Sequence, residues 1–517
     1  MHPNVVLNYT RSDGVSVQAS DRAIRWVSKA LGPLQSIDFR TTRKWGFSVS
    51  TFALRSNESL GIGDLDDLRK CMDTLGQMGA EFCTISPLGL WSSRSPYEHY
   101  PYAPGSRILI DPVHVSMASA GIISTGPVPS SWKEARRRKI ALIRRLVTEN
   151  PLILRQDEFR KWAAEATTRA QREALFALER KSRSIEPHYD ELSSMTDDEL
   201  LGADLGPYWW TQYEAERQLK IARMVMPVYG DLPVGVASPG LDAEMWPHSI
   251  LTGANLGAPS DADHVKPQVW AVHGWDPRGL ARCGYVPYRQ TLETNLKFYS
   301  GLRVDHALAL GRQYIVPIAG DTFEGVYVRS DTSALTEILV SHVSPDGTPY
   351  LYLELIGTPF DELEAFVSYH GLPRYRLLLA DLDQRIDRKD LVALTNHDTP
   401  TLKGLWTRCD LAMQHSLGFH GDDAALNQLL ERTREYVGGS ACFSEYQNAL
   451  YERLSGCAAD RVTAHLEDML GMEYRLHYPG HAKGPDYQAP HPRTIEQWRS
   501  DGRVQKLCEI LSTKRGM

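Results

Sequence analysis

The sequence has few cysteines, no long apolar run and no excess of positive charge. Its 517 residues include 7 cysteines, and no pair of them has Cys-x-x-Cys spacing. An odd number without that spacing argues against a disulfide framework or a structural zinc site and is typical of a reducing cytoplasm. No apolar stretch approaches the ~20 residues that a membrane-spanning helix needs, and the first residues show no signal-peptide pattern. We therefore expect a cytoplasmic protein without a membrane partner.

The charge balance is acidic, with 57 basic and 64 acidic residues and a formal net charge of −7. Nucleic-acid binding needs clustered Lys and Arg, so we expect no nucleic-acid partner. The one basic cluster, Arg136-Arg137-Arg138-Lys139, runs into apolar residues spaced three to four apart. We interpret it as the solvated face of an amphipathic helix. The sequence does not indicate the oligomeric state.

The order of the predicted elements is that of a parallel α/β protein. Alternating apolar residues over 45–54 predict a strand, and a 3.6-residue period over 65–78 predicts a helix with Asp64 as its cap. A short apolar run at 82–85 follows as a second strand. The Gly61-Ile62-Gly63 turn lacks the later glycine of a dinucleotide fingerprint.

Five apolar strand candidates each end in an acidic residue. In a (β/α)8 barrel the reactive groups come from the carboxyl ends of several strands, which meet on one face. The acids could instead cap the helices that follow, but as a set they favour a shared site. They are Asp231, Asp305, Glu354, Asp381 and Asp398.

We therefore predict a (β/α)8 TIM barrel with helical insertions. Residues 41–130 would begin the barrel and residues 224–517 would complete it, with insertions in the active-site loops. Residues 131–223 are rich in Arg, Glu, Ala and Leu at helical spacing and would form a helical insertion, with Trp209-Trp210 in its core. Residues 1–40 would be an N-terminal extension packed on the barrel.

The carboxylates suit retaining glycoside chemistry, which needs one as the nucleophile and one as the acid/base. Arg303, two residues before Asp305 on one strand, would hold that aspartate ionised. Glu354 lies among apolar residues, and desolvation would raise its pKa. His397 and Asp398 would bind neighbouring sugar hydroxyls. A metal site built on the Asp305-His306 and His397-Asp398 pairs is an alternative, although no His-x-His or HExxH spacing occurs.

Two aromatic loops would supply flat surfaces for a sugar. One is 91–102, which contains Tyr97, and the other is 268–275, which contains Trp270 and Trp275. Exposed rings can stack on the C–H face of a sugar, although tryptophans in such loops can also pin them to the barrel.

These segments together resemble the amylomaltases, the 4-α-glucanotransferases of the α-amylase clan. The resemblance runs in blocks from about 45 to 487. The main blocks are 56–64 (SNESLGIGD), 230–234 (GDLPV), 302–306 (LRVDH), 397–402 (HDTPTL) and 478–480 (YPG). It implies a barrel without the separate C-terminal β-domain common among α-amylases. It also implies no cofactor and no metal.

The resemblance implies a role for each matched residue. Asp305 would be the nucleophile, Glu354 the acid/base, and Asp398 with His397 would bind the sugar at the cleavage point. Arg303 would orient Asp305, Asp231 would bind sugar hydroxyls, Tyr97 would stack under the ring, and Trp270 would belong to a lid that excludes water. The donor would be an α-1,4-glucan or maltooligosaccharide, and the acceptor glucose or an oligosaccharide.

Three positions depart from the family pattern. Leu355 stands where the family has Asp, which would make the surroundings of Glu354 more apolar or alter the strand register. His477 replaces a usual Asn, and Pro485-Asp486-Tyr487 replaces a usual Asn-Trp. Two alternatives therefore stay open beside the transferase: an α-glucan hydrolase using the same site, and a glucan-binding relative with degraded catalysis.

Overall fold

The computed structural model describes most of the chain. The described residues are 42–91, 100–121, 129, 131–182, 206–260, 267–318, 325–357, 360–417, 423–478, 487 and 490–515, with the short strands β1 (Asn8–Thr10) and β2 (Ser16–Gln18). Most of the predicted extension 1–40, part of the predicted insertion 131–223, and Tyr97 lie outside these residues. The predicted division into segments therefore stays a prediction.

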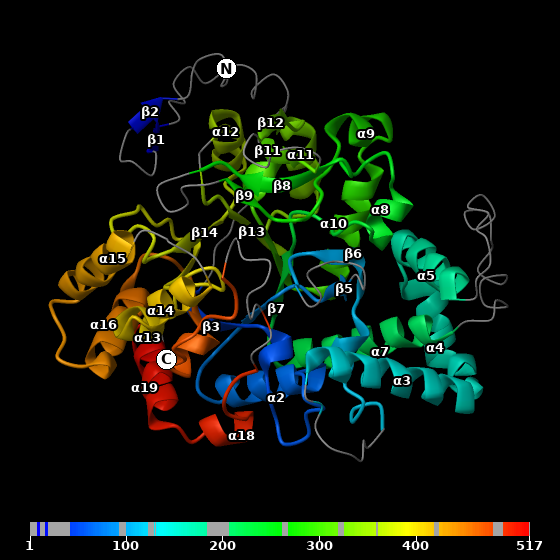
Figure 1. Ribbon diagram of the computed structural model, residues 1–517, viewed down its shortest axis with the longest axis horizontal. Helices are drawn as coiled ribbons and strands as arrows, with labels where there is room; N and C mark the ends of the chain where they lie inside the picture. The colour runs from blue at the N-terminus through cyan, green and yellow to red at the C-terminus, as the bar shows by residue number, and fades with distance from the viewer. Residues whose placement is uncertain are drawn as a thin grey trace.

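Eight parallel strands form a closed barrel at the centre of the molecule (Figure 1). Each strand pairs with its neighbours in chain order, and the last pairs with the first. Nearly every residue of these strands is buried, as expected for strands covered on both faces. The predicted TIM-barrel fold is confirmed. The strands are β3 (Lys44–Val49), β4 (Cys83–Ile85), β7 (Val228–Leu232), β10 (Gly301–Val304), β13 (Tyr350–Glu354), β14 (Arg374–Leu377), β15 (Leu391–Ala393) and β16 (Arg461–His465).

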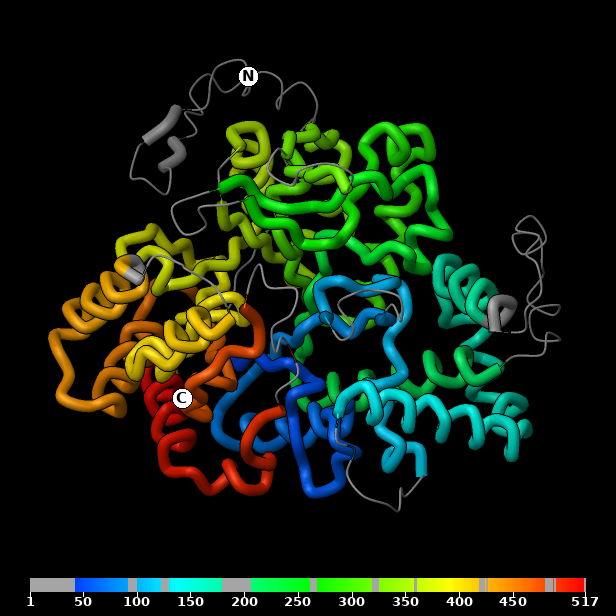
Figure 2. Tube along the Cα trace, in the orientation of Figure 1, coloured from blue at the N-terminus to red at the C-terminus, as the bar shows by residue number. Residues whose placement is uncertain are grey.

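The two ends of the described barrel lie side by side, as the blue and red tubes of Figure 2 show. All five residues of β16 pair with β3. The indole Nε1 of Trp45 donates to the hydroxyl of Ser512 in helix α19 (Gly502–Thr513) at 3.0 Å. The C-terminal helix therefore seals the strand pair that closes the barrel.

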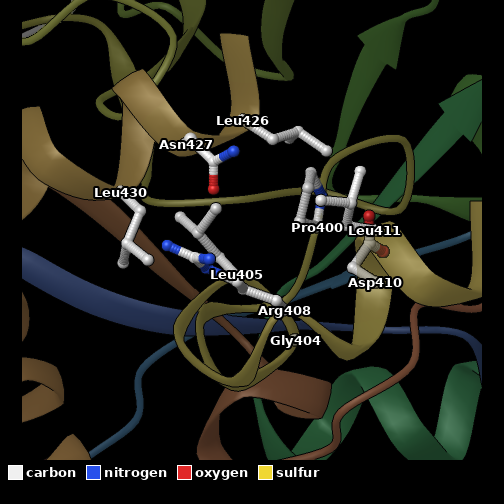
Figure 3. Close-up of a pocket in the computed structure, with 9 residues that line it drawn as sticks. All are labelled: Pro400, Gly404, Leu405, Arg408, Asp410, Leu411, Leu426, Asn427 and Leu430. Carbon is white, nitrogen blue, oxygen red and sulfur yellow. The ribbon is translucent and has the colours of Figure 1, made fainter. Parts of the chain in front are cut away.

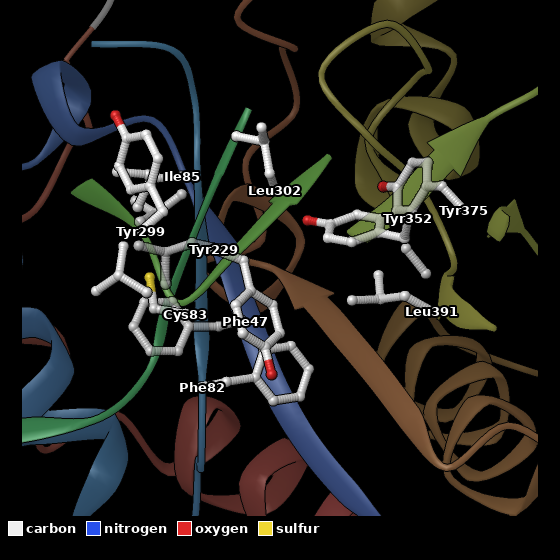
Figure 4. Close-up of a cluster of buried hydrophobic side chains, with 14 of the residues drawn as sticks. Phe47, Phe82, Cys83, Ile85, Tyr229, Tyr299, Leu302, Tyr352, Tyr375 and Leu391 are labelled. Atoms are coloured by element: carbon white, nitrogen blue, oxygen red, sulfur yellow. The ribbon is translucent and has the colours of Figure 1, made fainter. Parts of the chain in front are cut away.

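Large aromatic side chains fill the barrel near the amino ends of strands β4 and β7 (Figure 4). Tyr229 stacks on Phe82 at 5.1 Å between ring centroids and lies 6.3 Å from Tyr352. Gly301 of β10 leaves room for this ring, because a Cβ there would come within 2.7 Å of the Tyr229 side chain. A packed base of this kind leaves the opposite end of the strands free for a site.

Helices surround the barrel. Helix α2 (Leu65–Gly76) begins as predicted at Asp64, which forms a reciprocal capping box with Asp67. The others that follow barrel strands are α10 (Val286–Phe298), α11 (Thr332–Ser341), α12 (Asp361–His370), α13 (Leu402–Thr407), α14 (Cys409–Ser416), α15 (Asp423–Tyr436), α16 (Phe443–Gly456), α17 (Leu466–Met469) and α18 (Ile495–Trp498). After β16 the described residues are helical or irregular, without a further strand.

A group of helices extends to one side of the barrel, on the right of Figure 1. Trp209 and Trp210 are buried in it, as predicted. The prediction that the basic cluster 136–139 is solvated is wrong for Lys139. This side chain is fully buried and pairs with Asp64 at 3.0 Å, because the helix packs this face on the cap of α2. The elements are α3 (Trp132–Glu149), η3 (Pro151–Arg155), α4 (Asp157–Lys161), η4 (Trp162–Ala166), α5 (Arg169–Ser182) and α7 (Pro207–Val225).

Two small antiparallel sheets, which the sequence did not predict, rise from the barrel loops. One consists of β12 (Val326–Arg329), β11 (Arg312–Pro317), β8 (Ala254–Ala258) and β9 (Gln268–Val269) and carries Trp270 just after its last strand. The other is the pair β5 (Gly89–Trp91) and β6 (Pro104–Ile110). Short helices α8 (Leu241–Met245) and α9 (Pro277–Arg282) lie nearby. None of the described helices is long and apolar enough to cross a bilayer.

The barrel strands end earlier than predicted. The predicted strand 45–54 ends at Val49 and continues as the short turn η1 (Thr51–Ala53). Strand β10 ends before Asp305 because His306 adopts a left-handed conformation with φ of 42°. Strand β15 ends at Ala393, and beyond it the Asn396 side chain accepts a bond from the Asp398 N–H in a turn. Two of the catalytic candidates therefore lie on tight turns instead of on strands.

Candidate active site

One buried arginine lies at the centre of the site. Its Nη1 contacts Asp231 Oδ2 at 2.5 Å and Asp305 Oδ1 at 3.0 Å, and its Nη2 contacts Glu354 Oε1 at 2.7 Å. The arginine is Arg303, and its side chain is 6% exposed. Strands β7, β10 and β13 are neighbours in the barrel, so alternation along each strand turns these side chains to the same interior. The sequence predicted the Arg303–Asp305 contact, and the fold adds the other two.

Glu354 is held by a second donor. The backbone N–H of His306 donates to its Oε2 at 2.9 Å, and the left-handed conformation of His306 directs this group. The N–H of Val234 donates to Asp305 Oδ2 at 3.3 Å. Both carboxylates are thus oriented by one shared guanidinium and by one backbone donor each.

The pKa order of the pair is the reverse of the sequence expectation. Burial raises the pKa of Asp305 well above its ordinary value, and the nearby Glu354 and Asp231 charges add to the effect against the pull of Arg303. Burial also acts to raise the pKa of Glu354, but Arg303 and the His306 N–H outweigh it and lower that pKa. Arg303 therefore favours the ionised form of Glu354 more than that of Asp305.

Leu355 does not have the expected effect on Glu354. The register of β13 is regular, with Leu353 beside Arg374 and Glu354 beside Tyr375 of β14. Leu355 packs against the hydrophobic core as a partly buried side chain. Since the Glu354 carboxylate instead faces Arg303, the apolar neighbour does not decide its pKa.

Asp398 is clamped between two imidazoles. His477 Nδ1 lies 2.7 Å from its Oδ1, and His397 Nε2 lies 3.1 Å from its Oδ2. Burial acts to raise the pKa of Asp398, but the two histidines outweigh it and lower that pKa well below its ordinary value. The Asp398 side chain is 38% exposed, against 13% for Asp305, so it presents its surface at the open side of the site.

A tyrosine joins the two halves of the site. The hydroxyl of Tyr102 donates to Asp231 Oδ2 at 2.9 Å and lies 3.2 Å from His397 Nδ1. Its ring stacks on the His397 imidazole with centroids 4.3 Å apart. Asp231 and His397, both predicted site residues, are thereby fixed to each other although Asp231 lies on strand β7 and His397 in the turn after β15.

The loop that carries Asp398 is braced from behind. Arg475 donates to the Asp398 carbonyl and pairs with both oxygens of Asp410 at 2.8 Å each. Asp410 also lines a small cavity of about 230 Å³ between α13, α14 and α15, with Leu405 and Leu430 among its walls (Figure 3). This cavity lies behind the bracing pair and is separate from the catalytic cluster.

A cleft of about 450 Å³ opens above the barrel core. It is lined by 48–50, 84–86, Tyr102, Asp231, Arg303, Tyr352, Tyr375, Asn396, His397 and His465. Several buried polar atoms of its lining residues have no hydrogen-bond partner within the described part of the protein, among them Ser48 Oγ, Asp231 Oδ1 and His465 Nδ1. Such atoms need hydrogen bonds, and sugar hydroxyls or water would supply them.

Of the remaining predicted residues, Trp270 lies next to Asp305, whereas Asp381 does not join the described cluster. Trp270 is partly buried, and its ring lies edge-on to the His306 imidazole at 4.7 Å, next to Asp305. Burial lowers the pKa of His306 to about 4, so this imidazole is neutral. Asp381 does not join the described cluster, because its carboxylate accepts a bond from Asp383 N–H within its own turn. Tyr97 lies outside the described residues.

Several site residues were not assigned from the sequence. Tyr102 belongs to the aromatic loop that the sequence singled out, but its partners lie 129 and 295 residues away. Tyr100, from the same loop, has its hydroxyl 3.0 Å from His477 Nε2. Arg475 gave no signal, because only the folded chain brings it to Asp398.

The described part of the chain contains neither a cluster of possible metal ligands nor a disulfide. No group of three or more His, Cys, Asp and Glu side chains there has the arrangement of a metal site. All seven cysteines lie within the described residues and are unpaired.

The sequence is similar to a family of named enzymes. A model of the 4-alpha-glucanotransferase family matches residues 49–492. The 4-alpha-glucanotransferase of Mycobacterium tuberculosis (strain ATCC 25618 / H37Rv) is 24% identical over 550 residues, which cover 91% of this chain and 75% of the relative. That of Haemophilus influenzae is also 24% identical, over 438 residues, with 72% of this chain and 62% of the relative covered.

Solved structures share the fold. Amylomaltase from Corynebacterium glutamicum matches with a TM-score of 0.75 and 22% identity, covering 95% of this chain and 76% of its own. Amylomaltase from Streptococcus agalactiae in complex with acarbose matches with a TM-score of 0.67 and 15% identity, covering 92% of this chain and 100% of its own. Since the family model spans most of the chain, this protein belongs to the 4-alpha-glucanotransferase family and is an enzyme that acts on α-glucans.

Proposed function

We propose that the protein transfers a 4-α-glucanosyl unit with retention, through a covalent glycosyl-aspartate. The carrying observation is that Arg303 bridges Asp305 and Glu354 through its two terminal nitrogens, at 3.0 and 2.7 Å. Both carboxyl groups are therefore within reach of one guanidinium, the closeness that retaining chemistry needs. The donor would be an α-1,4-glucan or maltooligosaccharide, and the acceptor glucose or an oligosaccharide.

In the first half-reaction an Asp305 oxygen bonds to the anomeric carbon while the glycosidic C–O bond breaks. Glu354 gives its proton to the departing oxygen, so the first product leaves as a neutral sugar. In the second half-reaction Glu354 takes the proton of an acceptor hydroxyl, whose oxygen attacks the anomeric carbon and displaces Asp305. Each bond formed replaces one broken, and the enzyme returns to its starting protonation.

The proton must rest on Glu354 at the first step, whereas the pKa directions favour it on Asp305. A pair this close titrates as a unit with shared macroscopic pKa values. The positive charge that develops on the sugar ring lies against Asp305 and stabilises its ionised form. We infer that the approach of the sugar moves the pair's single proton to Glu354.

The surrounding residues would bind the sugar and exclude water. Asp398 and His397 would hold neighbouring hydroxyls at the cleavage point, and Asp231 would bind another through its unpartnered Oδ1. Trp270 would cover the nucleophile from the side of His306. Water exclusion matters because a sugar hydroxyl has to compete with water at about 55 M for the same intermediate.

The test is the product profile from maltotriose. Transfer gives glucose and a ladder of longer oligosaccharides with a constant number of reducing ends. Hydrolysis gives glucose and maltose with a rising number of reducing ends, and this result would replace the proposal by the hydrolase alternative. Retention of the protein on an amylose column without turnover of maltotriose would indicate a binding protein. Stereochemistry is read by NMR of the newly formed glycosidic linkage, where an α configuration supports retention and a β configuration contradicts it.

A further inference from the structure

His477 has a place in the site that no assigned role uses. Its imidazole is 8% exposed and sits on the side of Asp398 opposite His397. The Nδ1 contact at 2.7 Å is shorter than the His397 contact at 3.1 Å. The side chain of Asp398 is therefore held at both oxygens, with the tighter contact on the His477 side.

One arrangement of hydrogens satisfies both ring nitrogens of His477. With its hydrogen on Nδ1, the ring donates to the ionised Asp398 and accepts from the Tyr100 hydroxyl at Nε2, 3.0 Å away. Asp398 is the ionised partner, because its pKa lies well below the ordinary value. The ionised carboxylate only accepts, so it requires the hydrogen of His477 on Nδ1 and leaves Nε2 free to accept from the Tyr100 hydroxyl.

The ring itself has little freedom to move. It stacks on Tyr487 with centroids 5.3 Å apart and planes 14° apart, and Tyr487 packs edge-on against Phe52 at 5.5 Å. Tyr487 and Phe52 are both fully buried. His477 is consequently a rigid donor, whereas Asp398 is 38% exposed and has little packing of its own to fix its orientation.

We propose that His477 is a positioning residue, which holds the Asp398 carboxylate in the orientation that the transition state requires. This inference rests on the proposed function, in which Asp398 binds sugar hydroxyls as the ring flattens. A hydrogen bond that strengthens in the transition state raises kcat more than it lowers KM. Loss of the His477 donor therefore lowers kcat while KM changes little.

A matched pair of variants separates the two ring contacts. Asn places its amide near the position of Nδ1, and Gln places its amide near that of Nε2. His477→Asn keeps a donor beside Asp398 and loses the Tyr100 contact, and His477→Gln does the reverse. We expect His477→Gln to lower kcat for maltotriose about 10- to 100-fold, the effect of one hydrogen bond to a charged group, with KM within about threefold. His477→Asn should recover at least about tenfold of that loss.

Equal kcat values for the Asn and Gln variants, or a loss confined to KM, would overturn the proposal. Thermal unfolding of both variants checks that they are folded. If His477→Gln does not fold, His477→Ser takes its place, because its side chain is too short to reach Asp398 and should lower kcat to the same degree. A wild-type enzyme that leaves maltotriose unchanged would contradict the proposed function instead, since this inference compares variants of an active enzyme.

Discussion

Replacing Asp305, the proposed nucleophile, should make the protein more stable as well as inactive. Burial raises the pKa of Asp305 well above its ordinary value, so ionising this group in the folded protein is unfavourable. Asp305→Asn keeps the shape and removes the ionisation. We expect turnover of maltotriose to fall by several orders of magnitude, because an amide cannot form the glycosyl ester, and the melting temperature at pH 8 to rise.

The sign of the pH dependence follows from linkage. Below the pKa of the unfolded chain, Asp305 is protonated in both states and the substitution changes nothing. Above the raised pKa of the folded state, the wild type carries the full cost of the buried charge, and Asp305→Asn removes it. The difference in melting temperature between variant and wild type should therefore be close to zero near pH 4 and grow as the pH rises.

The size of the effect can be worked from the chain length. Each pH unit by which the folded-state pKa of Asp305 exceeds the unfolded one costs about 1.4 kcal/mol at high pH. A chain of 517 residues, at about 2.1 cal/mol/K per residue, has an unfolding entropy of roughly 1.1 kcal/mol/K. Every such pH unit then corresponds to about 1.3 °C in melting temperature, which differential scanning calorimetry resolves.

The matched control is Asp381→Asn, which alters an aspartate in a turn that does not join the described cluster. It should leave the melting temperature and the turnover unchanged across the same pH range. A melting temperature of Asp305→Asn that falls below the wild type as the pH rises would refute the reasoning. It would mean that Arg303 stabilises the ionised aspartate, as the sequence suggested.

Three further substitutions test other parts of the site. Trp270→Ala should raise the ratio of hydrolysis to transfer several-fold, because the ring no longer excludes water. The increase in reducing ends measures hydrolysis, and an unchanged ratio would contradict the proposed lid role. Tyr102→Phe should lower kcat/KM about tenfold by removing the hydroxyl bridge, with maltotriose consumption as the assay. Asp410→Asn leaves Arg475 buried without its charged partner and should lower the free energy of unfolding in urea by about 3–5 kcal/mol. An unchanged free energy of unfolding would contradict a stabilising role of this pair.

Seven of the eight barrel strands could be predicted because they carry their signal locally, whereas β16 was not predicted. Segments such as 350–354 are short buried runs with an acid at the end, and neither pattern depends on distant contacts. The sheet formed by β8, β9, β11 and β12 could not be predicted in this way. Its strands are two to six residues long and pair across loops, as Tyr314 does with Gly257, so the pairing depends on the finished barrel.

The candidate site divides in the same manner. Arg303 and Asp305 are two residues apart in the sequence, so the alternation expected of a strand predicts their contact, although β10 itself ends at Val304. The contact of Arg303 with Glu354 depends on the pairing of β10 with β13, and it reverses the predicted pKa order. A sequence reading assigns the arginine to its near neighbour, whereas the fold divides the same charge among three carboxylates.

That division of charge would let one cluster supply both the acid and the base of the proposed reaction. Asp231, Asp305 and Glu354 would carry three negative charges against the single positive charge of Arg303 if all were ionised in a buried site. Burial disfavours that excess, so the cluster retains a proton at a pH where a free aspartate has lost its own. Transfer between sugars requires one proton to leave with the first product and an equivalent one to return from the acceptor. A cluster that keeps one proton in reserve meets both needs, and the position of that proton then depends on which carboxyl group faces the sugar's positive charge.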